Sequence, residues 1–180
     1  MSMVKAKYVN IPDMKVRLII GFALTIAIII FDQLTKYYAV QNLALYESYV
    51  VFPGFNFTLA HNTGAAFSFL SDAGGWQRFF FIGLGSFVSI SIIFWMKSLP
   101  TDKRCLFFAL ALVLGGVIGN VWDRIQYGYV IDFIDISLAF LPWKIFNPWP
   151  TFNIADSAIF IGAIMLIIDA FWFNDNENDV

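Results

Sequence analysis

Four stretches of this chain are long and apolar enough to cross a membrane as single helices. Crossing the hydrocarbon core takes about 20 apolar residues in a helix, because each residue adds only about 1.5 Å. The candidate spans cover residues 18–40, 79–96, 105–122 and 154–173. The pattern therefore predicts a membrane protein that is mainly α, with four transmembrane helices in a single domain.

The segments between the spans, 41–78 and 123–153, carry a different pattern. Apolar and polar residues alternate over 55–59, after a turn signal at Pro53 and Gly54, which is typical of a half-exposed strand. Residues 129–134 are rich in β-branched and aromatic side chains, which favour strands. We therefore expect a small extracytoplasmic β-sheet that rests on the membrane surface.

The stretch 138–150 connects the second expected strand to the fourth span. Trp143 and Trp149 favour the headgroup layer, and three prolines prevent one continuous helix. This composition fits a mobile interfacial segment that covers a site at the outer face. A static loop that is anchored by its aromatic side chains fits the same composition.

Lysine and arginine are unevenly distributed between the two sides of the membrane. Cytoplasmic loops carry an excess of these residues. Seven of them precede the first span or lie between the second and third: Lys5, Lys7, Lys15, Arg17, Lys97, Lys103 and Arg104. The other side has four: Lys36, Arg78, Arg124 and Lys144. The bias predicts that both termini are cytoplasmic and that the expected strands face outward.

Composition narrows the classes of function. Hydrophobic residues make up 59% of the chain and charged residues only 13%, and no basic stripe is present, which argues against a nucleic-acid partner. The lone His61 excludes a multi-histidine metal site, and no motif calls for a metal or another cofactor. The lone Cys105 lies in an apolar run and cannot form an internal disulfide.

Asp132 and Asp156 are the most unusual residues of the chain. Each lies where apolar sequence meets a polar outer loop, and an unpaired carboxylate at such a depth is costly. Singly, Asp132 fits a solvated strand position, and Asp156 fits a helix start whose dipole favours an anion. Together, two carboxylates can share one proton and activate water. Asp135, on the same expected strand, is a rival partner, whereas Asp169 belongs to the opposite end of the fourth span.

Two further polar motifs lie at the same expected ends of the spans. Asp32 and Lys36 are four residues apart and can pair on one helix face. That pair belongs either to a site or to an ion pair that marks the end of the span. In the run His-Asn-Thr-Gly-Ala-Ala-Phe, Asn62 and Gly64 allow a tight turn, which also fits a loop that returns to the membrane.

A third motif occupies residues 115–124. The spacing of Gly115 and Gly119 is typical of close helix packing, but packing alone leaves the polar residues at its end unexplained. Asn120 and Arg124 share a helix face and can donate hydrogen bonds to a peptide or lipid carbonyl. Asp123 can orient Arg124 or cap a turn.

As a set, these motifs resemble those of lipoprotein signal peptidase, also called signal peptidase II, the membrane aspartyl protease family of bacteria. The matching motifs are Asp-Gln-x-x-Lys from Asp32, Asn-x-Gly-Ala-Ala-Phe from Asn62, Gly-Gly-x-x-Gly-Asn-x-x-Asp-Arg from Gly115, Val-x-Asp-Phe from Val130 and Phe-Asn-x-Ala-Asp-Ser from Phe152. They cover nearly the whole chain, with four spans in the family's order.

The resemblance implies an aspartyl endopeptidase of the bacterial cytoplasmic (inner) membrane, with its active site toward the outer face. Its substrates would be prolipoproteins whose lipobox cysteine carries diacylglycerol, and it would cut just before that cysteine. The antibiotic globomycin would block it. Asp132 and Asp156 would be catalytic. The residues implied to shape the pocket and hold the substrate are Asp32, Lys36, Asn62, Gly64, Asn120, Arg124 and Asn153.

Two other classes of protein fit parts of the pattern. A proton-coupled transporter uses intramembrane carboxylates as a relay, but four spans are few and no inverted repeat is visible. A purely structural membrane protein leaves the gathering of aspartates and asparagines at one face unexplained. Cleavage of a lipidated peptide by purified protein, without any ion gradient, distinguishes a protease from both.

Overall fold

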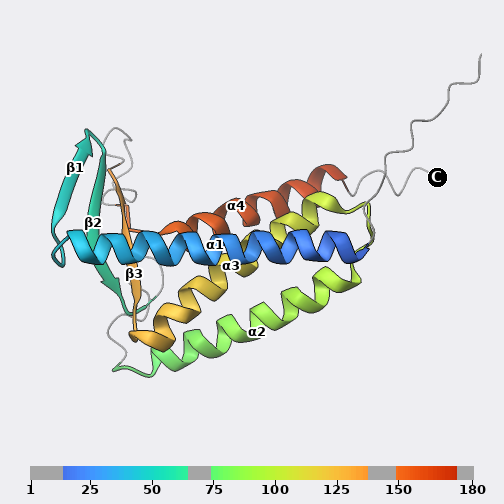
Figure 1. Ribbon diagram of the computed structural model, residues 1–180, viewed down its shortest axis with the longest axis horizontal. Coiled ribbons are helices and arrows are strands. Elements are labelled where there is room, and N and C mark those ends of the chain that lie inside the picture. Colours follow the sequence, from blue (N-terminus) through green and yellow to red (C-terminus); the bar gives the residue numbers. More distant parts are fainter. Residues whose placement is uncertain (1–13, 65–73, 138–148, 174–180) are drawn as a thin grey trace, which may run out of the picture.

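The computed structural model describes residues 14–64, 74–137 and 149–173. Four helices in this part of the chain are long and apolar enough to cross a membrane (Figure 1). They are α1 (Met14–Asn42), α2 (Gln77–Ser98), α3 (Arg104–Gln126) and α4 (Ile154–Ile168), which continues into a short π-helix, η3 (Asp169–Phe173). The expected mainly α membrane architecture is confirmed, and α1, α2 and α3 extend slightly beyond the expected spans at both ends.

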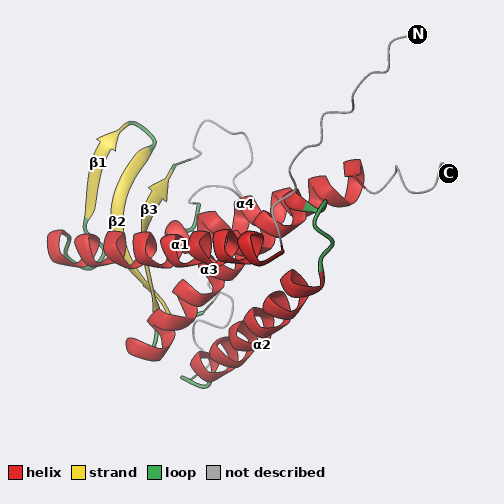
Figure 2. Cartoon of the chain, turned by 45° about the vertical axis from the view of Figure 1, so that its right-hand side comes forward, coloured by secondary structure: helices red, strands yellow, loops and turns green. Residues whose placement is uncertain are grey.

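A three-stranded antiparallel sheet lies across one end of the helices (Figures 1 and 2). Its strands are β1 (Ser48–Phe52), β2 (Phe55–Asn62) and β3 (Val130–Ile136), in the order β1-β2-β3. Both strands expected from the sequence are present, so the small sheet is confirmed. Side chains of β2 and β3, Leu59 and Phe133 among them, pack with Ala39 near the end of α1. The sheet thereby holds β3 where α3 ends and α4 begins.

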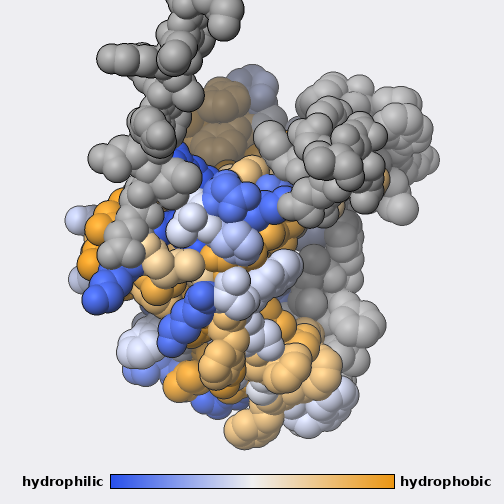
Figure 3. All heavy atoms as spheres, turned by 90° about the vertical axis from the view of Figure 1, so that its right-hand side faces the viewer, coloured by the Kyte–Doolittle hydropathy of each residue, from blue (hydrophilic) through white to orange (hydrophobic). Residues whose placement is uncertain are grey.

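The opposite end of the bundle holds the connection between α2 and α3. Figure 3 looks at this end and shows hydrophilic side chains there beside apolar ones. Lys15 begins α1, Lys97 ends α2, and Lys103 and Arg104 begin α3. The described lysines and arginines with exposed side chains, Lys15, Lys97 and Arg104, therefore lie at the end away from the sheet.

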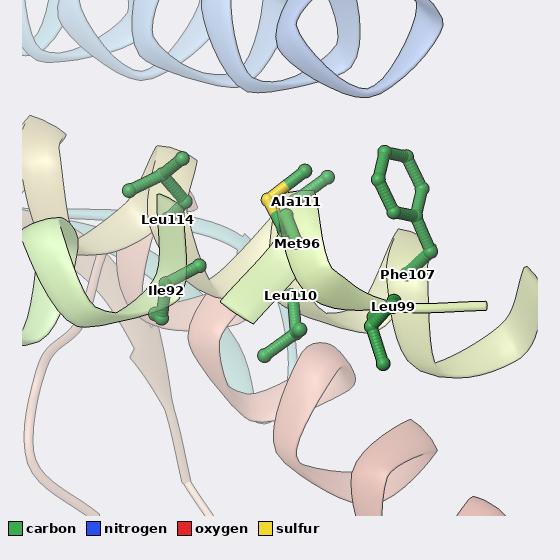
Figure 4. Close-up of a cluster of buried hydrophobic side chains, with 7 residues drawn as sticks. All are labelled: Ile92, Met96, Leu99, Phe107, Leu110, Ala111 and Leu114. Atoms are coloured by element: carbon green, nitrogen blue, oxygen red, sulfur yellow. The ribbon is translucent and has the colours of Figure 1, made fainter. Parts of the chain in front are cut away.

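The main apolar core lies between α2 and α3, toward the end away from the sheet (Figure 4). Its buried side chains are Ile92, Met96, Leu99, Phe107, Leu110, Ala111 and Leu114. Arg17 of α1 closes this end, because it donates hydrogen bonds to the carbonyls of Leu99 at 2.6 Å and Pro100 at 2.5 Å. Its guanidinium also lies 4.5 Å from the centre of the Phe107 ring. The carbonyls of the two residues that follow α2 are thus satisfied by a neighbouring helix.

α3 is the central helix and packs against α1, α2 and α4. Half of its most apolar window is buried, against 17–22% for the other three helices. Glycines allow the close approach: a Cβ on Gly115 would lie 2.9 Å from Ile28 of α1, and one on Gly119 would lie 2.8 Å from Asp32 and 3.3 Å from Ala155 of α4. The packing role expected for these two glycines is confirmed.

Candidate active site

The start of α4 is fixed by a reciprocal cap between Asn153 and Asp156. The Asn153 side chain accepts a hydrogen bond from the backbone N–H of Asp156 at 2.9 Å. The Asp156 carboxylate in turn accepts from the backbone N–H of Asn153 at 3.2 Å. These bonds satisfy donors that a helix start leaves open. The cap places the Asp156 carboxylate at the sheet end of the bundle.

The same Asn153 side chain connects Asp156 to Asp132. Because its oxygen is used by the cap, its Nδ2 group is turned toward β3, where it donates to Asp132 Oδ1 at 2.7 Å. The second oxygen of Asp132 accepts from Asn62 Nδ2 at 3.1 Å, at the end of β2. Among the described residues, neither aspartate forms a salt bridge. The two carboxylates are therefore held by neutral amides and remain free to bind a proton.

Asp132 has an unusual proton affinity because it is only 1% exposed. Burial and the nearby charge of Asp156 raise its pKa from 3.8 to about 7. The hydrogen bonds from Asn62 and Asn153, and the charge of Lys36, oppose this rise. A carboxyl group with a pKa near neutrality can hold a proton at physiological pH while its partner is ionised.

Asn120 of α3 supports the other side of the pair. Its Nδ2 donates to Asp156 Oδ1 at 2.7 Å, and its Oδ1 accepts from Lys36 Nζ at 3.2 Å and from Asn153 Nδ2 at 3.2 Å. A lysine ammonium only donates, so it fixes which way the Asn120 amide faces. The amides of Asn120 and Asn153 thus link the aspartates into one connected group.

A buried ion cluster lies beneath this group. Lys36 Nζ lies 2.7 Å from Asp32 Oδ2 and 2.8 Å from Asp123 Oδ2. The pairing of Asp32 with Lys36 expected from their spacing is therefore confirmed. Lys36 is only 1% exposed and Asp32 is fully buried, so neither has surface with which to touch a substrate. The pair does not lie at the water interface as a snorkelled pair would.

Asp123 and Arg124 are placed differently from the sequence expectation. Asp123 bonds to Lys36 and to Gln33 Nε2 at 2.8 Å, rather than orienting Arg124. Arg124 instead donates to the carbonyl oxygens of Asn120 at 3.3 Å and Gly64 at 2.7 Å. Gln33 was not singled out from the sequence, although it directly follows Asp32 in the motif.

Arg124 also fixes the turn after β2. The Gly64 N–H donates to Asn62 Oδ1 at 3.1 Å, so the tight turn expected here is present. Arg124 holds the carbonyl of the same glycine and lies 4.9 Å from the centre of the Phe81 ring of α2. The turn that carries Asn62 is thereby tied to both α2 and α3.

Asp135 is not the partner of Asp132. It accepts hydrogen bonds from Asn56 at 3.1 Å and Thr58 at 2.8 Å, both on β2. It lies three residues beyond Asp132, and side chains alternate between the faces of a strand, so the two carboxylates point to different faces. Asp169 begins η3, at the far end of α4 from Asp156, as expected.

Two apolar grooves open beside the aspartates. The larger has a volume of about 640 Å³, and its lining includes Asn62, Asp156 and the α4 side chains Ile159 and Phe160. Trp149 and Pro150, the last two residues of the expected interfacial cover, also line it. The rest of that cover, residues 138–148, lies outside the described residues.

The second groove has a volume of about 210 Å³ and lies between α2, α3 and α4. Asn120 and Arg124 supply its polar side chains, and Ile159 lines both grooves. Asp156 therefore lies on the larger groove, and Asn120, which donates to it, lies on the smaller one. Among the described residues, no three histidine, cysteine, aspartate or glutamate side chains gather as metal ligands.

Comparisons with known proteins identify relatives over most of the chain. The family described as signal peptidase (SPase) II matches residues 24–172. A lipoprotein signal peptidase of Alteromonas mediterranea is 50% identical over 150 residues, which cover 83% of this chain and 79% of the relative. One of Pseudomonas syringae pv. tomato is 50% identical over 151 residues, 82% of this chain and 83% of the relative.

Solved structures agree with this sequence similarity. A bacterial membrane enzyme solved by the in meso method at 2.3 Å resolution matches with a TM-score of 0.78 and 30% identity, covering 89% of this chain and 92% of that one. A second, at 1.9 Å resolution, matches with a TM-score of 0.71 and 30% identity, covering 84% and 92%.

Proposed function

The chain belongs to the signal peptidase II family, and on that premise we propose that Asp132 and Asp156 are its catalytic pair. The protein is a multi-pass membrane protease of the aspartic type, which removes the signal peptide from lipid-modified prolipoproteins. One observation carries the assignment of the pair: a single side chain, Asn153, connects the buried Asp132 to Asp156, which lines an apolar groove.

The chemistry follows from one proton on two carboxylates. The ionised aspartate takes a proton from water as general base, and the water attacks the scissile carbonyl. The protonated aspartate polarises that carbonyl and then helps to protonate the leaving amine. Asp132 can hold a proton near neutral pH because its pKa is raised to about 7, and the two groups titrate as a unit.

The surrounding residues divide into those that can touch a substrate and those that cannot. Asn62, Asn120, Asp156 and Arg124 line the grooves. The amides of the two asparagines and the guanidinium of Arg124 can bond an extended peptide, whose carbonyls need partners away from water. Gly64, Arg124 and Asn153 hold these groups in place and complete the pocket. Asp32 and Lys36 support the pair from below, because both are buried. The grooves receive the apolar parts of the substrate, and the cut falls just before the lipidated cysteine.

The orientation in the membrane is part of the proposal. The sheet end faces outward and both termini are cytoplasmic, in the inner membrane of a bacterium. The distribution of Lys97, Lys103 and Arg104 at the opposite end supports this orientation. Globomycin-type inhibitors bind at the same outer site.

Gel-shift assays with a diacylglyceryl-modified prolipoprotein test the catalytic pair. Asp132→Asn and Asp156→Asn keep the shape of the side chain but remove the acid–base function, and we expect losses of roughly 10²- to 10⁴-fold or more. Asp135→Asn is the matched control on the same strand and should cleave normally. Near wild-type cleavage by either pair variant would overturn the assignment.

Cysteine labelling tests the orientation. In a Cys105→Ser background, Tyr49→Cys on the exposed β1 strand should react with an impermeant reagent added outside, and Lys97→Cys should not. Both positions are exposed, so the opposite labelling pattern would show the opposite orientation in the membrane.

A further inference from the structure

Lys36 connects to both proposed catalytic aspartates by the same two-step path. Its ammonium binds Asp32, whose other oxygen accepts from the backbone N–H of Ala155 at 2.9 Å. It also binds Asp123, whose Oδ2 accepts from the backbone N–H of Ile131 at 3.2 Å. Ala155 and Ile131 are the residues immediately before Asp156 and Asp132. One buried cation therefore binds two carboxylates, and each of these holds the backbone N–H of the residue that precedes one aspartate of the pair.

From this geometry we propose that Lys36, Asp32 and Asp123 are positioning residues, which set the separation of the two catalytic aspartates and the charge around their shared proton. The proposal rests on the assignment of Asp132 and Asp156 as the catalytic pair. None of the three touches a substrate, because their side chains are almost completely buried. They act only through the groups that they hold.

Stability alone is a poor reason for such a cluster. Removing charges from water is costly, and replacing a buried ion cluster by well-packed apolar residues is often neutral or stabilising. Here all three bonds of the Lys36 ammonium go to acceptors on α1 and α3, and both carboxylates bond onward to α4 and β3. An apolar core could join these elements, but it could not fix two backbone N–H groups at defined points.

The cluster also contributes charge. Lys36 carries one positive charge and the two carboxylates carry two negative charges. The positive charge of Lys36 acts to lower the pKa of Asp132, against the effect of burial. The charged groups around Asp132 come from three elements and are Asp32 and Lys36 on α1, Asp123 and Arg124 on α3, and Asp156 on α4. On β2 its direct neighbour is the neutral Asn62.

The test is the pH dependence of cleavage in Lys36→Met, Asp32→Asn and Asp123→Asn, measured on purified protein with the lipidated substrate. Loss of the shared proton sets the alkaline limb of the profile. Removing the cation should move this limb to higher pH, and removing either anion should move it to lower pH, each by up to about one unit. A small displacement of the aspartates should lower kcat by about 10- to 100-fold, whereas KM should stay within about twofold.

Asp135→Asn is the matched control, because it makes the same change as the two Asp→Asn variants but lies outside the cluster, on β3. Opposite shifts for the cation and anion variants, with unchanged KM, support a positioning role. The proposal is overturned if the alkaline limbs of the cluster variants coincide with that of Asp135→Asn, or if KM rises while kcat is unchanged. If Lys36→Met fails to fold, the two Asp→Asn variants decide. If both of these also fail to fold, the cluster serves stability alone and the proposal is wrong.

Asp132→Asn, assayed in parallel, separates this inference from the proposed function. Near wild-type cleavage by Asp132→Asn would refute the catalytic pair itself. Loss of cleavage by Asp132→Asn, together with cluster variants that behave like Asp135→Asn, would refute only the positioning role.

Discussion

Replacing the buried Asp132 by asparagine should make the protein more stable at alkaline pH, although it removes activity. In the folded protein the pKa of Asp132 is about 7, against 3.8 for an ordinary aspartate. The folded state therefore resists ionisation of this group. The contribution of Asp132 to the free energy of unfolding is therefore fully present below about pH 4 and is lost as the pH rises through about 7. An asparagine at this position cannot ionise and escapes that loss.

The size of the effect follows from the shift in pKa. A change of about three units corresponds to about 4 kcal/mol above pH 7, at roughly 1.4 kcal/mol per unit. The substitution also replaces one acceptor by an amide that faces Asn62 or Asn153, both of which donate to Asp132. Losing one such bond costs about 1–2 kcal/mol. The net gain at pH 8 is therefore about 2–3 kcal/mol, and it disappears near pH 5, where the cost of ionising Asp132 in the wild type equals the cost of the lost bond.

Thermal unfolding in detergent measures this difference directly. At pH 8 the midpoint of Asp132→Asn should lie roughly 5–10 °C above that of the wild type, at about 2–4 °C per kcal/mol for a chain of this size. Near pH 5 the two midpoints should nearly coincide, and Asp135→Asn should show no such pH-dependent gain. A variant that is equally or less stable at pH 8, with a difference independent of pH, would refute the reasoning.

Two further substitutions test the packing around the pair. Gly119→Ala places a Cβ 2.8 Å from Asp32, so we expect a loss of stability of about 1–3 kcal/mol and slower cleavage. Gly83→Ala on α2 meets open space and should be neutral or slightly stabilising. Equal thermal midpoints for the two variants would contradict the close packing. Arg124→Ala frees the carbonyl of Gly64 and should weaken both cleavage and globomycin binding, and normal values of both in a stable variant would leave Arg124 without a role in the site.

The sequence was sufficient to predict the four helices because the bilayer imposes strict lengths on them, whereas β1 (Ser48–Phe52) was not predicted. Residues 55–59 and 129–134 were recognisable as strands from alternation and β-branched side chains, and both are strands of the sheet. The spacing of Asp32 and Lys36 on one helix was likewise enough to predict their pairing. Such predictions succeed where a local period determines which residues are neighbours.

The contacts between distant segments were harder to predict. Asp123 binds Lys36 and Gln33 on α1, and no local period indicates which residue of α1 faces which residue of α3. The sequence offered only local roles for Asp123, the orientation of Arg124 or the capping of a turn. Asp135 was a rival for Asp132 because both lie on one strand, yet alternation along that strand separates them. Both questions concern which side chains meet in three dimensions.

The central position of α3 has a consequence for biogenesis. In the described part of the chain, α1 and α2 each pack mainly on α3, and α1 meets α2 chiefly at the end away from the sheet, through Arg17 and Gly21. When helices leave the insertion machinery in chain order, the first two have no strong partner until the third arrives. Lys36 therefore lacks its second partner, Asp123, until α3 is inserted, and Asp156 follows with α4. The proposed catalytic pair is therefore complete only after α4, the last helix that the structure describes, has been inserted, and we expect no cleavage before that point.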